Sequence, residues 1–445
     1  MTISSIIISV ADFVCGYPLF CLLIGGGLFL FIYSRFVSIR CFPRALRALA
    51  DRKGNDGKGQ ITPFQALMSE ISSTVGMGNI AGVAIAITMG GPGAIFWMWV
   101  SAIVGMSTKF FEGTLSIMFK GKDDNGEVQG GPMYVMTEGL GKKWKPMAVL
   151  FTSFALVGTL CVMQANQLVE ALTSVVTTPL GIGNTLLLRF LMGMGICLIV
   201  ASVILGGIRR IAKIASRIVP LMVICYFILV ALICVLNIKE IPGMFAMIFN
   251  DAFNFKAGIG GFAGTAVIGA RRAALVNEAG IGTCSMMHGA SKNTSPVREG
   301  LIAMLGPAID SGLVCTLTSL PILIAGNYLD AEGVKGVYIA LGAFDKLLPG
   351  YGKGLLMVII FFFAFSTMFS YSYYGLKCTN FLFGSKKTKY YNYFYLSMLV
   401  VAAMLPLGIA VSIMDLAFAL MAFPNMLALF MLAPKVKAEM RVLDG

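Results

Sequence analysis

The stretch that decides the fold is Ser72-Ser73-Thr74-Val75-Gly76-Met77-Gly78-Asn79-Ile80-Ala81-Gly82, in the middle of a long apolar segment. A second stretch of this kind begins at Gly258-Ile259-Gly260-Gly261-Phe262-Ala263-Gly264-Thr265 and continues to Asn277-Glu278-Ala279-Gly280-Ile281-Gly282. Glycine and polar residues at this density are unusual in a helix that faces lipid. Irregular backbone at membrane depth is tolerated where it lines a buried cavity. We therefore predict two interrupted helices beside an internal binding site.

The composition of the whole chain is that of a membrane protein. Of its 445 residues, 58% are hydrophobic and 12% are charged, and the mean hydropathy is +0.85. Soluble domains carry about 25% charged residues, so this composition excludes a soluble globular protein. It excludes a disordered chain as well. The ten cysteines include no CxxC pair and no Cys/His cluster, so neither a zinc site nor a disulfide framework is indicated.

Runs of about 20 apolar residues are long enough to cross a bilayer. We predict an all-α polytopic membrane protein with eleven transmembrane helices. The predicted spans are 14–34, 64–89, 92–119, 147–174, 186–206, 217–237, 258–288, 299–325, 354–377, 391–408 and 411–433. The polar stretch 326–352 is expected to hold a partial helix on the outer face.

The distribution of cations predicts the orientation. The C-terminal tail and the alternate loops that share its side carry 25 Lys and Arg, whereas the opposite loops carry 5. Cytoplasmic loops collect Lys and Arg, so the N-terminus is predicted outside and the C-terminus in the cytoplasm. The same rule accounts for the net charge of +13 without nucleic-acid binding, which we do not expect. The predicted location is the plasma membrane, as in a bacterial inner membrane.

The two glycine-rich spans, 64–89 and 258–288, are each the first span in a set of five predicted spans. Because five is odd, the second set crosses the membrane with inverted topology, and such matched interrupted segments are typical of a transporter's midplane site. The alternative is that these glycines only allow close helix packing. The predicted organisation is an N-terminal helix and basic loop at 1–63, repeats at 64–257 and 258–433, and a tail at 434–445.

Several motifs carry a resemblance to a known family. They are Ser72 to Val83 with Gly90-Gly91-Pro92-Gly93-Ala94-Ile95-Phe96-Trp97-Met98-Trp99, Gly130-Gly131-Pro132-Met133-Tyr134, Gln164-Ala165-Asn166, Asn277 to Gly282, Pro296-Val297-Arg298 with Gly300-Leu301, Asp310 with Cys315-Thr316-Leu317-Thr318, and Phe365-Ser366-Thr367 with Ser372-Tyr373-Tyr374-Gly375. Together they resemble the alanine/glycine:cation symporter family, closely over 64–375 and in outline elsewhere.

The resemblance implies a fold similar to that of LeuT-like transporters, with a five-plus-five inverted repeat and one extra N-terminal helix. It implies uptake of alanine, glycine or a similar small neutral amino acid, driven by Na⁺ and in some members by protons. Na⁺ is then the coupling ion and no other cofactor is expected. The chain is expected to function as a monomer. The family usually has Trp where this chain has Tyr371, and the smaller ring predicts a larger pocket.

Both charges of an amino-acid zwitterion need partners inside a membrane. Half-helix N-termini offer unpaired N–H groups and a positive dipole end to the carboxylate, a role that we assign to the amides around Gly76, Gly78 and Asn79. Unwound carbonyls suit the ammonium group, and their predicted source is Val267-Ile268-Gly269. The side chains expected at the substrate are those of Gln164, Thr367 and Tyr371, the last two sharing a helix face because they lie four apart.

The resemblance to LeuT-like transporters implies the Na⁺ ligands. Hard cations prefer oxygen ligands, and the implied set is the carbonyls of Ser72 and Val75 with the hydroxyls of Ser366 and Thr367. Thr367 could serve the ion or the substrate. The alternative for Ser366 is a hydrogen bond to a carbonyl of its own helix.

Charged residues inside spans are costly and are functional candidates by default. Lys109 and Glu112 are expected to pair, being three apart. Arg272 and Glu278 are expected either to brace their helix or to form part of the inner gate. Asp310 is predicted to be a structural anchor or a gate partner. His288 either complements a helix C-terminus or relays a proton, and these alternatives stay open.

Other functional classes fit less well. A membrane enzyme would need a nucleophile with a base, paired carboxylates or a metal centre, and the chain has one histidine. A channel would normally assemble around a filter ring. A proton-coupled symporter or an exchanger of the same fold is the nearest alternative to the Na⁺ symporter.

Overall fold

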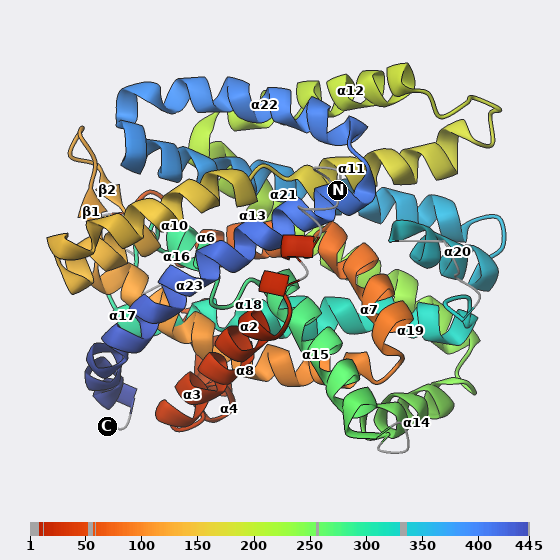
Figure 1. Cartoon of the computed structure of the whole chain (residues 1–445), viewed down its shortest axis with the longest axis horizontal. Helices are drawn as coiled ribbons and strands as arrows, with labels where there is room; N and C mark the ends of the chain where they lie inside the picture. The colour runs from red at the N-terminus through yellow and green to blue at the C-terminus, as the bar shows by residue number, and fades with distance from the viewer. Residues whose placement is uncertain are drawn as a thin grey trace.

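Helices form nearly all the regular structure in the computed structural model, which describes residues 9–11, 13–51, 57, 59–254, 258–329 and 336–443 (Figure 1). The two short strands β1 (Gly121–Lys122) and β2 (Val128–Gln129) pair antiparallel, with Gly121 opposite Gln129. The predicted all-α architecture is therefore confirmed for the described part of the chain.

The helical elements follow one another along the chain, and those with η labels are π- or 3₁₀-helical. They are α2 (Tyr17–Phe20), η1 (Cys21–Gly25), α3 (Gly26–Tyr33), α4 (Val37–Arg40), α5 (Phe42–Ala50), α6 (Pro63–Thr74), η2 (Gly78–Gly82), α7 (Val83–Gly90), α8 (Ala94–Met118), α9 (Pro132–Tyr134), η3 (Val135–Leu140), η4 (Lys142–Trp144), α10 (Lys145–Gly158), α11 (Val162–Leu172), η5 (Thr173–Thr177), α12 (Leu186–Ile204), α13 (Gly207–Leu236), α14 (Ile241–Ala252), α15 (Gly258–Asn277), α16 (Thr283–His288), α17 (Pro296–Ala303), α18 (Leu305–Pro307), η7 (Ala308–Val314), α19 (Cys315–Ala325), α20 (Val337–Leu347), α21 (Gly352–Phe383), η8 (Ser385–Lys387), α22 (Thr388–Met404), α23 (Leu407–Glu439) and η9 (Met440–Leu443).

Seven helices among the described residues are long and apolar enough to cross a bilayer, and an eighth is obtained when the bent pair α6 and η2–α7 counts as one span. The count of eleven spans and the five-plus-five repeat stay predictions. The helix expected within 326–352 is present as α20. The sequence analysis missed α14, a short helix between two predicted spans.

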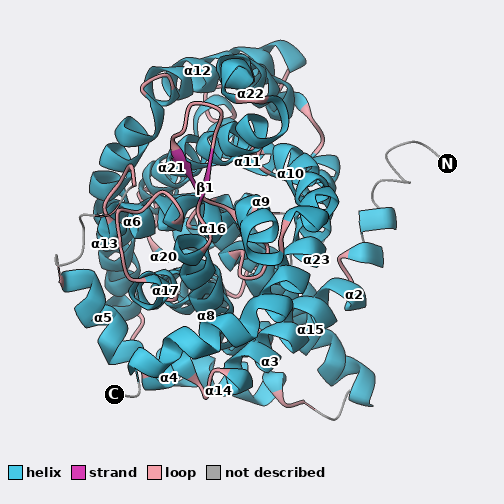
Figure 2. Cartoon of the chain, turned by 90° about the vertical axis from the view of Figure 1, so that its left-hand side faces the viewer, coloured by secondary structure: helices cyan, strands magenta, loops and turns pink. Residues whose placement is uncertain are grey.

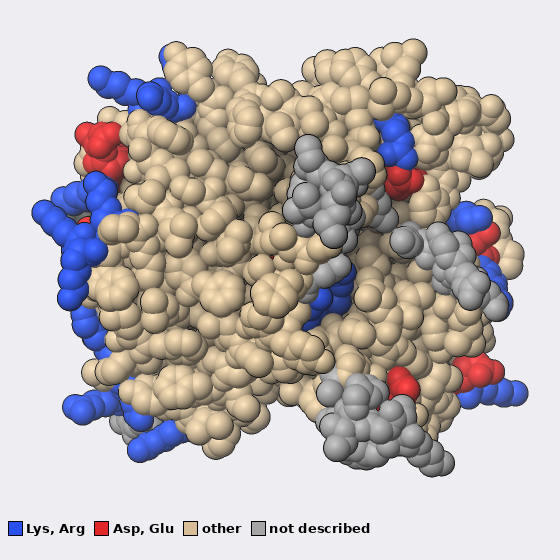
Figure 3. All heavy atoms as spheres, in the orientation of Figure 1, with Lys and Arg blue, Asp and Glu red and all other residues tan. Residues whose placement is uncertain are grey.

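Charged side chains lie mainly toward two ends of the molecule, and the belt between them is mostly uncharged on the face in view, apart from a small group of Lys or Arg near its middle (Figure 3). Lys and Arg gather at the end that holds the C-terminus, α17 and the β1–β2 hairpin, which we call the basic end (Figure 2). The opposite end holds α14 and α20. This separation follows the predicted loop asymmetry and leaves the belt for lipid.

The interrupted segments lie inside the helix bundle. α6 packs against α13 and α21, α15 and α17 pack against α8, and α12 and α22 pair at the periphery. Every residue from Ala66 to Thr74 is buried. The polar residues in this stretch therefore face protein rather than lipid, which is the condition for an irregular backbone at membrane depth.

One sequence prediction about the second interrupted segment is wrong. Val267-Ile268-Gly269 is not unwound, because α15 continues without a break from Gly258 to Asn277. A Cβ atom at Gly269 would lie 2.3 Å from the carbonyl oxygen of Ala94. Glycine is thus required here for the close approach of α15 to the start of α8, as in other small-residue helix contacts.

This contact predicts a stability difference between two glycines of one helix. Gly269→Ala should lower the free energy of unfolding by about 1–3 kcal/mol because the methyl group has no room. Gly264→Ala is the matched control, since no atom lies within 4 Å of its added Cβ, and it should be neutral or slightly stabilising. Thermal unfolding of both purified variants measures this, and equal midpoints would contradict the packing explanation.

Candidate functional site

The first interrupted helix breaks between α6 and η2. Val75 is extended (ψ 95°), and the two helical parts meet at a bend of 52°. A Cβ atom at Gly76 would lie 2.4 Å from Oγ1 of Thr367 on α21, so the chain needs glycine where it passes this helix. The break predicted from residues 72–82 is confirmed.

Asn79 joins the two sides of this break. The Gly76 amide donates to Oδ1 of Asn79 at 2.9 Å, and Nδ2 of Asn79 donates to the carboxylate of Asp310 in η7. Both side chains are fully buried. The contact between them is consistent with the anchor role predicted for Asp310, and the gate role stays a prediction. The second carboxylate oxygen of Asp310, Oδ2, has no hydrogen-bond partner.

The second interrupted helix breaks between α15 and α16. Glu278, Gly280 and Gly282 have positive φ angles of 56°, 90° and 104°, a region that favours glycine. Oδ1 of Asn277 accepts from the Ala279 amide at 3.0 Å. The irregular backbone thus occupies 278–282, about ten residues after the segment we predicted.

The charged residues near the breaks pair differently from the predictions. Arg272 does not brace Glu278, because it faces Asp415 of α23 at 3.6 Å. Arg271 faces the same carboxylate at 3.8 Å. The Glu278 carboxylate accepts instead from the hydroxyl groups of Thr283 and Tyr371. Spacing along the sequence could not identify these partners, because they lie on other helices than the residues they contact.

Lys109 also pairs differently. Its Nζ lies 2.5 Å from Oε1 of Glu70 on α6, so the expected pairing with Glu112 is wrong. Glu112 instead accepts from Nδ2 of Asn425 at 2.8 Å. The rule for charges inside spans identified Lys109 and Glu112 as candidates but could not show which helices would meet.

A small cavity opens beside the two breaks, with a volume of about 40 Å³. It is lined by Ser73, Thr74, Gly78, Gly82, Met163, Gln164, Arg272, Leu275, Val276, Glu278, Tyr371, Met414, Asp415 and Phe418. Oε1 of Gln164 is buried and has no hydrogen-bond partner. Since buried polar atoms are normally satisfied, this oxygen marks a place for a donor that the chain itself does not supply.

The predicted substrate residues fall into three groups. Gly78, Gln164 and Tyr371 line the cavity. Gly76, Asn79 and Thr367 lie at the break itself, behind the residues that line the cavity. Ile268 and Gly269 are outside the cavity lining, at the contact between α15 and the segment from Gly90 to Ala94. Asp415 was missed, although the rule that identified Glu278 applies equally to it.

The four residues predicted to bind Na⁺ meet where α6 crosses α21. The Ser72 hydroxyl donates to the Ser366 carbonyl at 2.8 Å. Oγ1 of Thr367 lies 3.5 Å from the Val75 carbonyl. The hydroxyl groups of Ser366 and Thr367 both also donate to the Phe363 carbonyl, at 3.0 and 2.9 Å. Oxygen ligands for a hard cation are thus concentrated here, although the alternative contact within the helix is present too.

A family model described as "Sodium:alanine symporter family" matches residues 1–444. The chain belongs to this family. Its members are transporters rather than enzymes, and the chain is a multi-span membrane transporter of a sodium-coupled amino-acid symporter family. The resemblance expected from the motifs is thereby confirmed.

Individual relatives agree with the family assignment. The chain is 37% identical to "Sodium/alanine symporter AgcS" of Methanococcus maripaludis, covering 100% of this chain and 98% of the relative. It is 33% identical to "Probable sodium/glutamine symporter GlnT" of Bacillus subtilis, covering 93% and 85%. Among solved structures, MhsT in complex with L-phenylalanine matches with a TM-score of 0.54 and 13% identity, covering 84% of this chain and 89% of MhsT. This likeness shows the LeuT fold.

The geometry predicts that Asn79 stabilises the break. Asn79→Ala removes the acceptor for the Gly76 amide and a donor to Asp310, and it should lower the free energy of unfolding by about 1–3 kcal/mol per group left unsatisfied. Asn392→Ala in α22 is the control, because Oδ1 of Asn392 already lacks a partner. Thermal unfolding in detergent compares them, and an effect no larger in Asn79→Ala than in the control contradicts the role.

Proposed function

We propose that this chain couples inward Na⁺ flow to the uptake of alanine, glycine or a similar small neutral amino acid by alternating access. The observation that carries the proposal is the meeting of both helix breaks around a small cavity with an unpartnered Gln164 oxygen. Matched interrupted helices around a midplane site are typical of secondary transporters. The names of the relatives, which include alanine and glutamine symporters, support an amino-acid substrate.

Both charges of the substrate need partners at the cavity. We assign the carboxylate to the segment Gly76, Gly78 and Asn79 at the start of η2, where the positive end of the helix dipole lies. Gly78 lines the cavity, whereas the Gly76 amide donates to Asn79 and the Asn79 amide to the Gly76 carbonyl, so these two residues hold the backbone behind it. The ammonium group would donate to Oε1 of Gln164. Backbone carbonyls of the break at 278–282 replace Val267–Gly269 as the predicted source of further acceptors. The small volume favours a short side chain, packed against Tyr371.

The Na⁺ site is assigned to the carbonyls of Ser72 and Val75 and the hydroxyls of Ser366 and Thr367. Ser72 belongs to α6, Val75 follows its last residue, and Ser366 and Thr367 belong to α21, so a bound cation would join α21 to the end of α6 at the break. The same break holds the substrate carboxylate. An ion that stabilises this backbone geometry therefore raises the affinity for substrate, and by linkage the substrate raises the affinity for the ion.

The pair of Arg272 and Asp415 is assigned to a gate on the opposite-end side of the cavity, not to the inner gate. Arg272 precedes the break on α15, and Asp415 lies near the start of α23, whose last turns reach the basic end. Glu278 contacts Tyr371 of α21 at the cavity itself. Separating α15 from α23 would thus break the pair and open a path to the substrate.

The membrane topology completes the proposal. We assign eleven spans, with repeats at 64–257 and 258–433, the basic end in the cytoplasm and the N-terminus outside. The location would be a bacterial inner membrane and the unit a monomer. The cation asymmetry between the two ends (Figure 3) supports this orientation.

Uptake of radiolabelled L-alanine into proteoliposomes tests the function. An inward Na⁺ gradient should drive accumulation that disappears when choline replaces Na⁺ and that glycine competes. Accumulation that follows a pH gradient instead would establish proton coupling. Counterflow without any ion gradient would reveal an exchanger.

The ion site predicts a change in Na⁺ dependence. Ser366→Ala should raise the Na⁺ concentration for half-maximal uptake about tenfold, because a lost contact to a charged group is worth about 1.5 kcal/mol. Ser372→Ala is the matched control on the same helix, since its hydroxyl donates to the Phe369 carbonyl as Ser366 does to Phe363. Unchanged Na⁺ dependence in Ser366→Ala would show that the hydroxyl only bonds its own helix.

A further inference from the structure

Four buried ionisable side chains from four helices form a chain of contacts that the substrate and Na⁺ sites do not use. Glu70 of α6 lies between Lys109 of α8 and His288 of α16, with Nζ of Lys109 at 2.5 Å from Oε1 and Nε2 of His288 at 2.8 Å from Oε2. Nδ1 of His288 lies 2.7 Å from Oε1 of Glu299 on α17. All four side chains are at most 1% exposed.

The contacts of the imidazole ring imply a stored proton. Both ring nitrogens face carboxylate oxygens, and an ionised carboxylate only accepts hydrogen bonds. A neutral imidazole has a single N–H group, so it can satisfy one of the two carboxylates but not both. When both ring nitrogens carry a proton, each donates to one of the two acids, so these contacts place the additional proton on His288.

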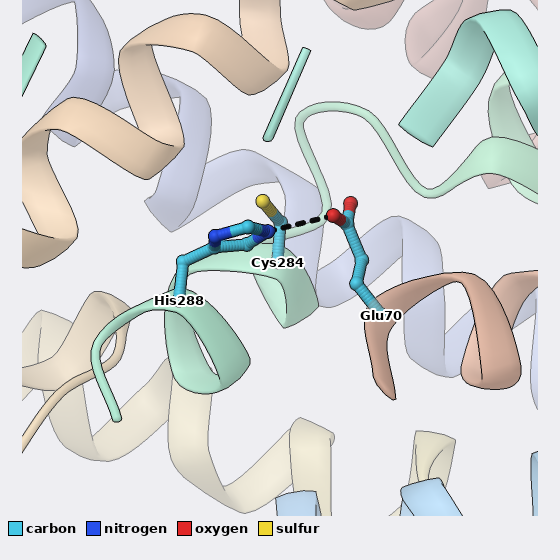
Figure 4. A group of neighbouring side chains, drawn as sticks. All are labelled: Glu70, Cys284 and His288. Atoms are coloured by element: carbon cyan, nitrogen blue, oxygen red, sulfur yellow. Dashed lines mark hydrogen bonds and ion pairs between the residues drawn. The ribbon is translucent and has the colours of Figure 1, made fainter. Parts of the chain in front are cut away.

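A metal ion is a poorer occupant of this cluster. Glu70, Cys284 and His288 present atoms within 4.8 Å of one another (Figure 4). However, the second oxygen of Glu70 is in contact with the Lys109 ammonium group, which would repel a cation at this distance. Both nitrogens of His288 already face acids. The charges present favour a proton over a metal.

Other polar and charged groups surround this chain of contacts. Nδ2 of Asn293 at 2.8 Å and Oγ of Ser291 at 3.1 Å donate to Oε2 of Glu299. Lys120 lies at the same loop, donating to the Ser291 carbonyl at 2.7 Å. Further titratable groups that face the cluster are Glu112 on α8, Cys284 on α16, Glu278 at the second break, Asp310 in η7 and Tyr374 on α21.

The cluster connects the two half-helices on the basic side of the breaks. α6 precedes the first break and α16 follows the second, and the contact between Glu70 and His288 joins them directly. Any movement that separates α6 from α16 must break this contact. When the His288 imidazole carries the additional proton, its contact with Glu70 is a charge-assisted hydrogen bond. When the proton is absent, one ring nitrogen presents a lone pair to a carboxylate oxygen, and the contact is lost or weakened.

We propose that His288 binds a proton between Glu70 and Glu299 and in that state latches α6 to α16, and that the latch opens when the imidazole releases this proton to water at the basic end. The role of the latch in transport rests on the proposed function, whereas the proton site itself does not. The proton returns from the side to which it left, so the site exchanges protons without carrying them across the membrane.

Labelling of Cys284 tests the latch in purified, detergent-solubilised protein, without any need for transport. This buried thiol lies beside Glu70 and His288 (Figure 4), so N-ethylmaleimide should reach it only after the latch opens. Cys161, buried outside the cluster, serves as internal reference. In the wild type, the ratio of Cys284 to Cys161 labelling should rise at least about fivefold between about pH 6 and about pH 9. Site-resolved mass spectrometry measures the ratio.

Two variants make the outcome decisive. His288→Gln cannot bind the proton, so its labelling ratio should be high and independent of pH. Asn293→Ala removes a neutral donor to Glu299, which leaves more of the negative charge of that carboxylate to favour the protonated imidazole and should shift the transition to higher pH. Glu138→Gln, at an exposed acid of the basic end, should keep the wild-type profile.

If the labelling ratio changes with pH in the same way in the wild type and in His288→Gln, the proposal is overturned. If His288→Gln does not fold, an unshifted profile in Asn293→Ala overturns it equally. Absence of alanine uptake alone would count against the proposed function and leave the proton site standing, because the labelling does not depend on the substrate. A ratio of Cys284 to Cys161 labelling that does not change with pH in the wild type would overturn the latch. It would leave the proposed transport function untouched.

Discussion

The structure depends on keeping a non-helical backbone satisfied at membrane depth. Between Val75 and Gly78 the chain gives up its helical hydrogen bonds, and in lipid each lost bond would cost several kcal/mol. Asn79 supplies the acceptor for the Gly76 amide and is itself held by Asp310. Both residues are buried because α6, η2 and η7 lie inside the bundle. The outer helices thus protect the break from lipid.

The same constraint explains the distribution of charges. Inside the bundle every ionised group needs a partner from another helix, since desolvation of a lone charge exceeds what the fold can tolerate. Lys109 meets Glu70, and Arg272 meets Asp415. Each contact couples the positions of two helices. Breaking such a contact exposes a buried charge, so helices joined in this way move only when water or a proton can replace the partner.

The sequence predicted the parts of the site that depend on local chemistry. The pattern of glycine and asparagine at 76–79 predicted the first break, because those residues tolerate and cap an irregular turn. The family resemblance, rather than any local pattern, predicted that Ser72, Val75, Ser366 and Thr367 lie close together at one ion site. Gln164 was predicted to hydrogen-bond the substrate. It lines the cavity, and its Oε1 has no partner among the described residues, while its role stays a prediction.

The failures came from tertiary packing. The glycines from Gly258 to Gly269 suggested an unwound segment, yet Gly269 serves a helix contact and the break needs the positive φ angles of Gly280 and Gly282. Spacing along one helix suggested that Lys109 pairs with Glu112. The true partner lies 39 residues away on α6. Which faces of distant helices meet is not encoded in local spacing, so neither partner could be identified without the fold.

The two guanidinium groups of Arg271 and Arg272 share the single carboxylate of Asp415 among the described residues. Of these two cations only Arg272 lines the cavity, where Asp415 and Glu278 lie beside it. Two consecutive cations of α15 thus hold one carboxylate of α23. Loss of either contact leaves the other in place, so α15 and α23 are released from each other only when both contacts have broken.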